Sequence, residues 1–228
     1  MTGLIILCRY NSNRLPGKIL KEINDKTILK YIHERLELIK NEVKIVVATS
    51  ELKSDDIIEQ FCKLNLIECF RGDLHNVSKR FLDCAEYFNF NTAIRINGDN
   101  LFTDSNLIDE MLNYYNANTL NFLSNVKGRT WPKGISIEIV NTKFYKSNVI
   151  YFNEKDKEHV MTFFYRNKKQ NVKFLKNKNK INTKINLSID TLNDFEFAET
   201  IISLMEKNHT EYNFKDIIKL GEKIRYEK

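Results

Sequence analysis

The chain has 228 residues, of which 42% are hydrophobic and 29% are charged, a composition typical of a single globular domain with a sizeable core. Seven glycines and two prolines are too few for a turn-rich all-β protein or for long disordered linkers. The formal net charge of +6 favours an anionic partner, such as a nucleic acid, a membrane surface or a phosphate-bearing small molecule.

Short apolar runs alternate with amphipathic segments through the first half of the chain. We predict buried strands at 4–7, 43–50, 67–72 and 92–98, and helices at 27–40, 54–65, 76–88 and 104–116. The helix at 54–65 would begin with Ser54 as its N-cap, followed by an acidic first turn. This alternation predicts an α/β fold with a doubly wound, mostly parallel sheet of the Rossmann-like type.

The pattern changes in the second half. Residues 121–145 look like strands around a turn, and strands are also predicted at 172–177 and 183–190. Helices are predicted at 154–167, 194–207 and 214–227. We therefore expect one domain over 1–228 that contains a small antiparallel excursion at about 121–185.

Other features of the sequence argue against several kinds of site. The four cysteines form no C-x-x-C pair and stand in apolar patterns, so neither a zinc site nor a disulfide framework is expected. His33, His75 and His209 have no supporting cluster and are interpreted as surface residues. The basic run at 166–184 lacks regular aromatic residues, which favours a solvated face over a nucleic-acid site.

The location of the protein is predicted from what the N-terminus lacks. It has no basic segment followed by a cleavable apolar one, and no stretch reaches membrane-spanning length. We therefore expect a cytoplasmic protein with neither a membrane nor a nucleic-acid partner.

The loop that follows the first strand is the first candidate site. Arg9, Arg14 and Lys18 would supply charge-assisted hydrogen bonds to phosphate oxygens, and Gly17 would let the backbone approach them closely. Pro16 stiffens the loop, so less order is lost on binding. The spacing matches neither a Walker P-loop nor a G-x-G-x-x-G fingerprint, and a solvated basic turn is the simpler alternative.

Two aspartates form the second candidate site. Asp99 and Asp190 each end a predicted strand, and ligands bind beyond the carboxyl ends of parallel strands. A carboxylate pair together with triphosphate oxygens suits Mg²⁺. Either aspartate alone is more simply a helix or turn cap, but both together opposite a cationic loop favour a metal site. Arg95, within a strand, could pair with a carboxylate.

The segment "CRYNSNRLPGKIL" (8–20) resembles the signature loop of the CTP-dependent cytidylyltransferases that activate acidic sugars. These are the acylneuraminate and 3-deoxy-manno-octulosonate enzymes and the related spore-coat polysaccharide F-type proteins. Cys8 stands where alanine is usual, and Phe102 where proline is usual. Further segments match in the family's order, so the resemblance covers nearly the whole chain: 46–50, 70–81, 95–104, 131–139, 157–167 and 187–197.

The resemblance implies a fold of the nucleotide-diphospho-sugar transferase type and a Mg²⁺-dependent enzyme, with Mn²⁺ as a substitute. It would transfer CMP from CTP to a sugar acid or a related hydroxyl or phosphate acceptor, release pyrophosphate, and serve surface polysaccharide biosynthesis. The acceptor would be a small anionic or polyol compound. The resemblance also implies a homodimer.

The residues that match the family's motifs are assigned roles on that basis. The catalytic residues would be Arg9, Arg14 and Lys18. Nucleotide binding would involve Cys8, Arg9, Ser12, Arg14, Gly17, Lys18, Arg71, Gly72, Val77, Arg80, Asn97, Gly98 and Asp99. Acceptor binding would involve Trp131, Lys133, Glu138, Glu158 and His159. The metal would be held by Asp99 and Asp190.

Three other functions stay open from the sequence. A sugar-nucleotide-dependent glycosyltransferase can share this architecture, although it typically carries D-x-D where this chain has Gly98-Asp99-Asn100. A regulatory protein could bind the nucleotide without turnover. A basic RNA-binding protein would bind with an affinity that falls steeply as salt rises.

Overall fold

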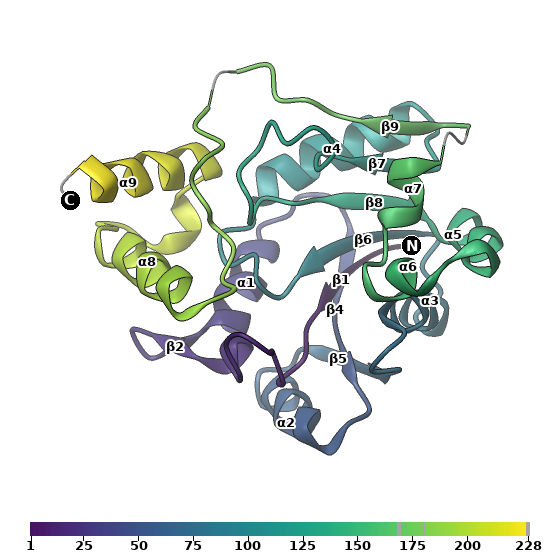
Figure 1. The fold of residues 1–228 in the computed structure, drawn as a ribbon, viewed down its shortest axis with the longest axis horizontal. Coiled ribbons are helices and arrows are strands. Elements are labelled where there is room, and N and C mark those ends of the chain that lie inside the picture. The colour runs from purple at the N-terminus through teal and green to yellow at the C-terminus, as the bar shows by residue number, and fades with distance from the viewer. Residues whose placement is uncertain (168–169, 180, 227–228) are drawn as a thin grey trace.

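A computed structural model describes residues 1–167, 170–179 and 181–226 of the chain. Its centre is a seven-stranded sheet with the strand order β5-β4-β1-β6-β8-β7-β9 (Figure 1). The strands are β1 (Thr2–Leu7), β4 (Val43–Ser50), β5 (Glu68–Gly72), β6 (Thr92–Asn97), β7 (Phe122–Ser124), β8 (Glu138–Asn141) and β9 (Val172–Phe174). A small antiparallel sheet joins β2 (Glu22–Ile23) and β3 (Lys26–Thr27).

The parallel half of the sheet follows the predicted βα alternation. β1 lies between β4 and β6, and β5 extends the sheet beyond β4, all four strands being parallel. The helices that follow these strands are α1 (Ile28–Leu36), α2 (Asp56–Leu64), α3 (Val77–Tyr87) and α4 (Ser105–Ala117). The prediction of an α/β fold with a mostly parallel sheet is confirmed.

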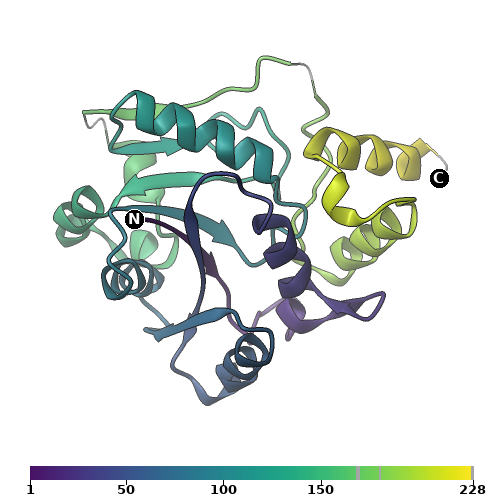
Figure 2. The ribbon, with the colours of Figure 1, turned by 180° about the vertical axis from the view of Figure 1, so that it is seen from behind.

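Both faces of the sheet are covered, because the central strands are apolar on both sides. Leu4 and Ile6 of β1 pack into one core cluster with α1, α2 and α4, whereas Ile5 and Leu7 pack into another with α3. Figure 2 shows α1 and α4 lying across one face of the sheet. The strand alternation therefore divides a continuous apolar run between two cores.

The second half adds antiparallel strands, as predicted. β8 pairs antiparallel with both β6 and β7, and β9 forms the edge of the sheet beside β7. Between β8 and β9 lie α5 (Thr142–Asn148), the 3₁₀ helix η3 (Val149–Tyr151), α6 (Glu154–Glu158) and α7 (Thr162–Arg166). This segment packs against α3, since the Ser78 hydroxyl donates to the carbonyl of Asp156.

Three predicted elements were wrong in detail. Residues 183–190 form no strand; their backbone makes an isolated bridge between Asn186 and Lys133 and single hydrogen bonds, such as that from the Ile189 amide to the Asp99 carbonyl. The helix predicted at 154–167 is split, because the backbone at Val160 turns to a positive φ of 35°. Ser54 is not the N-cap of α2: that position is occupied by Asp55, and the buried Ser54 hydroxyl has no partner.

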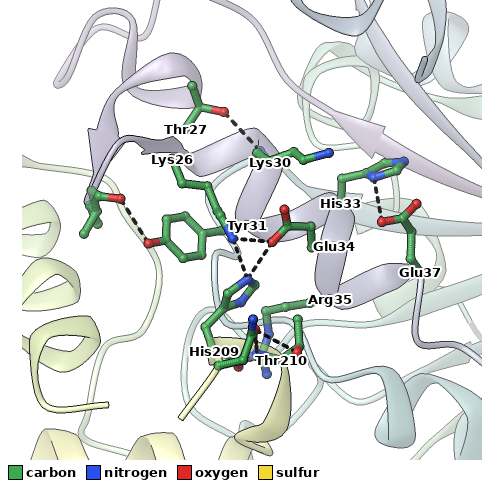
Figure 3. Close-up of polar contacts among 12 residues, drawn as sticks. Lys26, Thr27, Lys30, Tyr31, His33, Glu34, Arg35, Glu37, His209 and Thr210 are labelled. Carbon is green, nitrogen blue, oxygen red and sulfur yellow. Dashed lines mark hydrogen bonds and ion pairs between the residues drawn. The ribbon is translucent and has the colours of Figure 1, made fainter. Parts of the chain in front are cut away.

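The chain closes with α8 (Leu192–Ser203), η4 (His209–Glu211) and α9 (Phe214–Tyr226); residue 227, predicted to belong to the last helix, lies outside the described residues. Figure 3 shows how this region is attached to α1: Lys26 and His209 converge on the Glu34 carboxylate, at 2.5 and 2.8 Å. Arg35, also on α1, donates to the carbonyls of Thr103 and Tyr212.

This attachment corrects the interpretation of the histidines. His209 is 7% exposed and His33 is 9% exposed, so neither is a surface residue, whereas His75 is exposed as predicted. Burial lowers the pKa of His209 below its usual range, although the Glu34 carboxylate opposes the shift. The four cysteines are all free. Over the described ranges, no helix is both long and apolar enough to cross a bilayer.

Candidate active site

A cavity of about 430 Å³ lies at the carboxyl ends of β1 and β6. Its volume is in the range of small-molecule sites. The cavity brings together residues that the sequence placed far apart, from the opening loop, α3, the end of β6, the α6–α7 junction and the segment before α8. The predicted site residues that line it are Cys8, Arg9, Ser12, Arg14, Lys18, Val77, Arg80, Asn97, Gly98, Asp99, Glu158, His159 and Asp190.

The opening loop is folded around the backbone of Tyr10. The amides of Ser12 and Gly17 both donate to the Tyr10 carbonyl, at 2.9 and 2.8 Å, and the Tyr10 amide donates to Asp55 at 2.9 Å. Gly17 has a φ of 70°, a backbone conformation that residues other than glycine seldom adopt. The loop is thus held in one shape by its own backbone and by one carboxylate.

Asp55 is the residue that the sequence interpretation missed. Its carboxylate is fully buried and also accepts hydrogen bonds from the Thr49 hydroxyl and from the amide and hydroxyl of Ser50. Burial raises the pKa of Asp55, but the hydrogen bonds from Ser50, Tyr10 and Thr49 outweigh it and hold the pKa below its usual range. Asp55 therefore stays ionised and ties the end of β4 to the loop after β1.

Lys18 and Arg14 meet Asp190 across the cavity. The Lys18 ammonium lies 2.6 Å from the carbonyl oxygen of Ile189 and 3.2 Å from Asp190 Oδ1. Arg14 reaches the same Oδ1 at 3.0 Å, with 65% of its side chain exposed against 15% for Lys18. Lys18 is therefore the more desolvated cation. Water screens its charge less, so its attraction for an anion bound in the cavity is stronger.

Asp99 lies deeper in the same cavity. Its Oδ1 is buried and has no hydrogen-bond partner. Burial raises the pKa of Asp99; the charge of Lys18 lowers it and that of Asp190 raises it, so both groups are close enough to act on this carboxylate. An unpartnered buried carboxylate oxygen beside a second carboxylate is a donor set that fits a hard divalent cation.

The two aspartates would need additional ligands to hold a metal. Among the described residues, no group of three or more His, Cys, Asp or Glu side chains is placed to hold a metal ion. Mg²⁺ commonly takes one or two carboxylates and completes its shell with substrate phosphates and water. The residues present therefore fit a metal that arrives with a nucleotide rather than one held by protein ligands alone.

Arg80 forms part of the wall beside the loop. It is 2% exposed, its Nη1 donates to the carbonyl of Asp73 at 3.0 Å, and its Nε has no partner. Burial lowers its pKa, and the nearby Cys8 and Asp55 oppose the shift. Gly72 leaves space for this side chain, because a Cβ on Gly72 would lie 3.0 Å from Arg80 Cγ.

Arg95 lines the floor of the cavity. It pairs with a carboxylate, which was one possibility that the sequence left open. Its guanidinium contacts Glu138, which lies directly opposite in the β6–β8 pair. It also donates to the side-chain oxygen of Asn97 at 2.6 Å. Glu138 itself is 2% exposed and is enclosed behind the cavity rather than on its wall.

Several predicted site residues are not brought to this cavity. Arg71 pairs with Asp56 and Glu59 at 2.9 and 2.8 Å, and with Gly72 it lines a second cavity of about 470 Å³. Trp131 is buried in the core, and Lys133 is exposed in the loop that precedes β8. Of the residues predicted to bind the acceptor, Glu158 and His159 line the cavity.

Comparisons with known proteins identify the family of this chain. A family model described as cytidylyltransferase matches residues 4–217. The spore coat polysaccharide biosynthesis protein SpsF of Bacillus subtilis is 30% identical over 208 residues, covering 86% of this chain and 84% of that protein. A cytidylyltransferase structure from Leptospira borgpetersenii superposes with a TM-score of 0.91 at 31% identity, covering 99% of this chain and 95% of that one.

A more distant structure shares the fold. CMP:2-keto-3-deoxy-manno-octonic acid synthetase, solved with CTP, gives a TM-score of 0.65 at 13% identity, covering 89% of this chain and 98% of that one. The two chains therefore share an architecture. The match over residues 4–217, together with relatives of about the same length, shows that the chain belongs to the cytidylyltransferase family.

Proposed function

We propose that this protein is a Mg²⁺-dependent enzyme that transfers CMP from CTP to a sugar acid or a related hydroxyl-bearing acceptor and releases pyrophosphate. The observation that carries the proposal is the meeting of Lys18 and Arg14 with Asp190 in a cavity that Asp99 also lines. Cations for a triphosphate and carboxylates for its metal face one another there. Membership of the cytidylyltransferase family supports CTP as the substrate, and similarity to the spore coat polysaccharide biosynthesis protein SpsF supports a role in surface polysaccharide synthesis.

The cationic loop would hold the triphosphate. Lys18 and Arg14, together with Arg9 at the start of the loop, present positive charge to the cavity. The acceptor oxygen would attack the α-phosphorus in line and form a new P–O bond. The bond from the α-phosphorus to its bridging oxygen would break as pyrophosphate leaves. Fixed cations stabilise the charge that develops on the phosphoryl and leaving oxygens, usually the largest catalytic contribution.

Asp99 and Asp190 would hold the metal together with the triphosphate. Mg²⁺ bound there, or Mn²⁺ in its place, would neutralise phosphate charge and lower the pKa of the acceptor hydroxyl. The Asp190 oxygen now shared by Arg14 and Lys18 would then have a third cation near it. Arg14 and Lys18 would consequently be free to leave Asp190 and to contact phosphate oxygens instead.

The acceptor would enter from the side of the α6–α7 junction. Glu158, His159 and Val160 form that wall, and the junction is fixed in place because the Tyr145 hydroxyl donates to the carbonyl of Val160 at 2.9 Å. A carboxylate and an imidazole at this wall suit a small acceptor rich in hydroxyl groups. The homodimer implied by the resemblance is also a proposal, for sedimentation to test.

Pyrophosphate release tests the proposal. Each of the four common nucleoside triphosphates is incubated with Mg²⁺ and a panel of sugar acids, polyols and polyol phosphates. We expect release with CTP and with one class of acceptor. A sugar-nucleotide-dependent glycosyltransferase would release no pyrophosphate under these conditions. Binding of CTP without turnover with any acceptor would favour a regulatory protein instead.

A further inference from the structure

A row of polar side chains runs behind the floor of the cavity, across three neighbouring strands. Ser124 of β7 lies opposite Glu138 of β8, which lies opposite Arg95 of β6. Tyr165 of α7 joins the row from above the sheet, with its hydroxyl 3.1 Å from Ser124 Oγ. The row therefore links the α6–α7 region to the strand that ends in the cavity.

Both oxygens of the Glu138 carboxylate are used within this row. Oε1 accepts a hydrogen bond from the Tyr165 hydroxyl, and Oε2 contacts Arg95 Nη1. The exposed fractions of the side chains are 3% for Glu138 and 17% for Arg95, so water competes little for either contact. Burial lowers the pKa of Arg95, but Glu138 outweighs it and the pKa is raised, so the guanidinium stays charged. Its contacts with Glu138 and Asn97 fix its direction.

The fixed guanidinium determines the orientation of Asn97. Arg95 Nη2 lies 2.6 Å from Asn97 Oδ1. A guanidinium only donates hydrogen bonds, so the amide oxygen must face Arg95 and the amide nitrogen must face the other way. Because Asn97 lines the cavity, its two N–H donors are presented there. The side chain thus offers two donors to a bound molecule, while its oxygen is engaged by Arg95.

Asn97 lies on the side of the cavity where the cationic loop begins. It pairs with Leu7 in the β1–β6 register, and the next amide, that of Gly98, donates to the Leu7 carbonyl at 2.9 Å. The approach is close, since a Cβ on Gly98 would come within 2.7 Å of Cys8 Cβ. The donors of Asn97 therefore adjoin the loop that would hold the nucleotide.

We propose that Asn97 donates a hydrogen bond to an oxygen of the bound cytidine nucleotide, and that Arg95, Glu138 and Tyr165 are positioning residues that hold its amide in the donating orientation. This inference rests on the proposed function. It gives Glu138, which the resemblance assigns to acceptor binding, a positioning role in nucleotide binding instead.

Calorimetric titration with CTP, without acceptor, tests the role of Asn97. In Asn97→Asp, one carboxylate oxygen keeps the contact to Arg95, so the melting temperature should be unchanged or higher. The other oxygen would repel the nucleotide oxygen where a donor stood, and the affinity for CTP should fall about tenfold or more. Asn13→Asp controls for the added charge, because Asn13 lines the same cavity without a fixed donor; its affinity for CTP should fall by a factor at least three times smaller than in Asn97→Asp.

Positioning is tested by a double-mutant cycle. Glu138→Gln weakens the hold on Arg95, and the affinity for CTP should fall about threefold or more in the wild-type background. In the Asn97→Asp background the same change should cost nothing further, whereas a general structural effect would persist. Tyr165→Phe, which keeps the ring packing, should show the same dependence on a smaller scale.

The outcomes separate the inference from the proposed function. Wild-type protein that binds no CTP would refute the proposed function and this inference with it. Wild-type binding with an unchanged affinity in Asn97→Asp, or an equal loss in Asn13→Asp, would overturn the role of Asn97 alone. An additive cycle would overturn the positioning roles of Glu138 and Tyr165.

Discussion

The replacement of Lys18 by methionine is the most direct test of the cationic loop. Methionine keeps most of the apolar stem of lysine and removes the charge. The side chain is 15% exposed, and its ammonium lies 2.6 Å from the Ile189 carbonyl and 3.2 Å from Asp190 Oδ1. We expect kcat/KM for CTP to fall while the fold is retained.

The expected size of the loss follows from the geometry. Two unit charges 3.2 Å apart, the separation of Lys18 from Asp190, attract by about 5 kcal/mol at an effective dielectric constant of about 20. A phosphate oxygen at the same distance would gain a similar energy, part of which desolvation offsets. Removal of one such stabilising group typically costs roughly 3 to 4 kcal/mol, so we expect kcat/KM to fall about 100- to 1,000-fold.

The assay is initial-rate pyrophosphate release with CTP, Mg²⁺ and the acceptor identified from the panel. Lys21→Met is the matched control, because Lys21 is in the same segment but lies beside the Phe195 ring, 5.6 Å from its centroid. We expect the control to keep at least half of the wild-type rate. Lys18→Met within threefold of wild type would refute the assignment of Lys18 to the reacting phosphates.

Asp99→Asn should reduce pyrophosphate release more than about 100-fold without lowering the melting temperature, because burial of the ionised carboxylate, seen in its raised pKa, already costs stability. Chelation of divalent cations should abolish release, and Mg²⁺ or Mn²⁺ should restore it. Burial lowers the pKa of His209, so the unfolded chain takes up a proton first as pH falls through about 6.5. Wild type should therefore lose more free energy of unfolding between about pH 7 and pH 5 than His209→Gln.

Each of these expectations has a contradicting result. A lower melting temperature in Asp99→Asn would mean that its carboxylate stabilises the fold. Full activity in chelator would remove the metal from the reaction. Equal pH dependence in urea unfolding of wild type and His209→Gln would show that His209 does not couple folding to protonation.

The parts of the fold that the sequence predicted depend on local signals. Residues 43–50 were predicted as a strand, and β4 occupies Val43–Ser50, because a run of branched apolar residues has no helical alternative of that length. Asp99 and Asp190 were paired on the expectation that both end parallel strands, which meet at one edge of a sheet. Both do line the cavity, but only Asp99 follows a strand, because residues 183–190 form none.

Other parts depend on contacts that no local pattern reveals. The pairing of Arg95 with Glu138 needs the β6–β8 register, which joins residues 43 positions apart. The acidic start of α2 predicted a helix correctly, but not that Asp55 would turn inward to hold Tyr10. The break at Val160 occurs at a residue other than glycine, so no local pattern marks it.

At residues 183–190 a local pattern predicted a strand that the structure does not contain. Their alternating apolar pattern is that of a strand, and the apolar residues are indeed buried. Their backbone, however, bonds to single points elsewhere, such as the Leu187 amide to the Lys133 carbonyl and the Ile189 amide to the Asp99 carbonyl. Alternation reports which side chains are buried, and it does not report whether a neighbouring strand is present.

The ion pair between Lys18 and Asp190 has a consequence for biosynthesis, because 172 positions of sequence separate its two ends. A ribosome makes the cationic loop early and Asp190 late, so the nascent polypeptide has the cations well before it has the carboxylate opposite them. The cavity that both residues line can therefore be completed only after the chain as far as Asp190 has been made and has packed against the cationic loop.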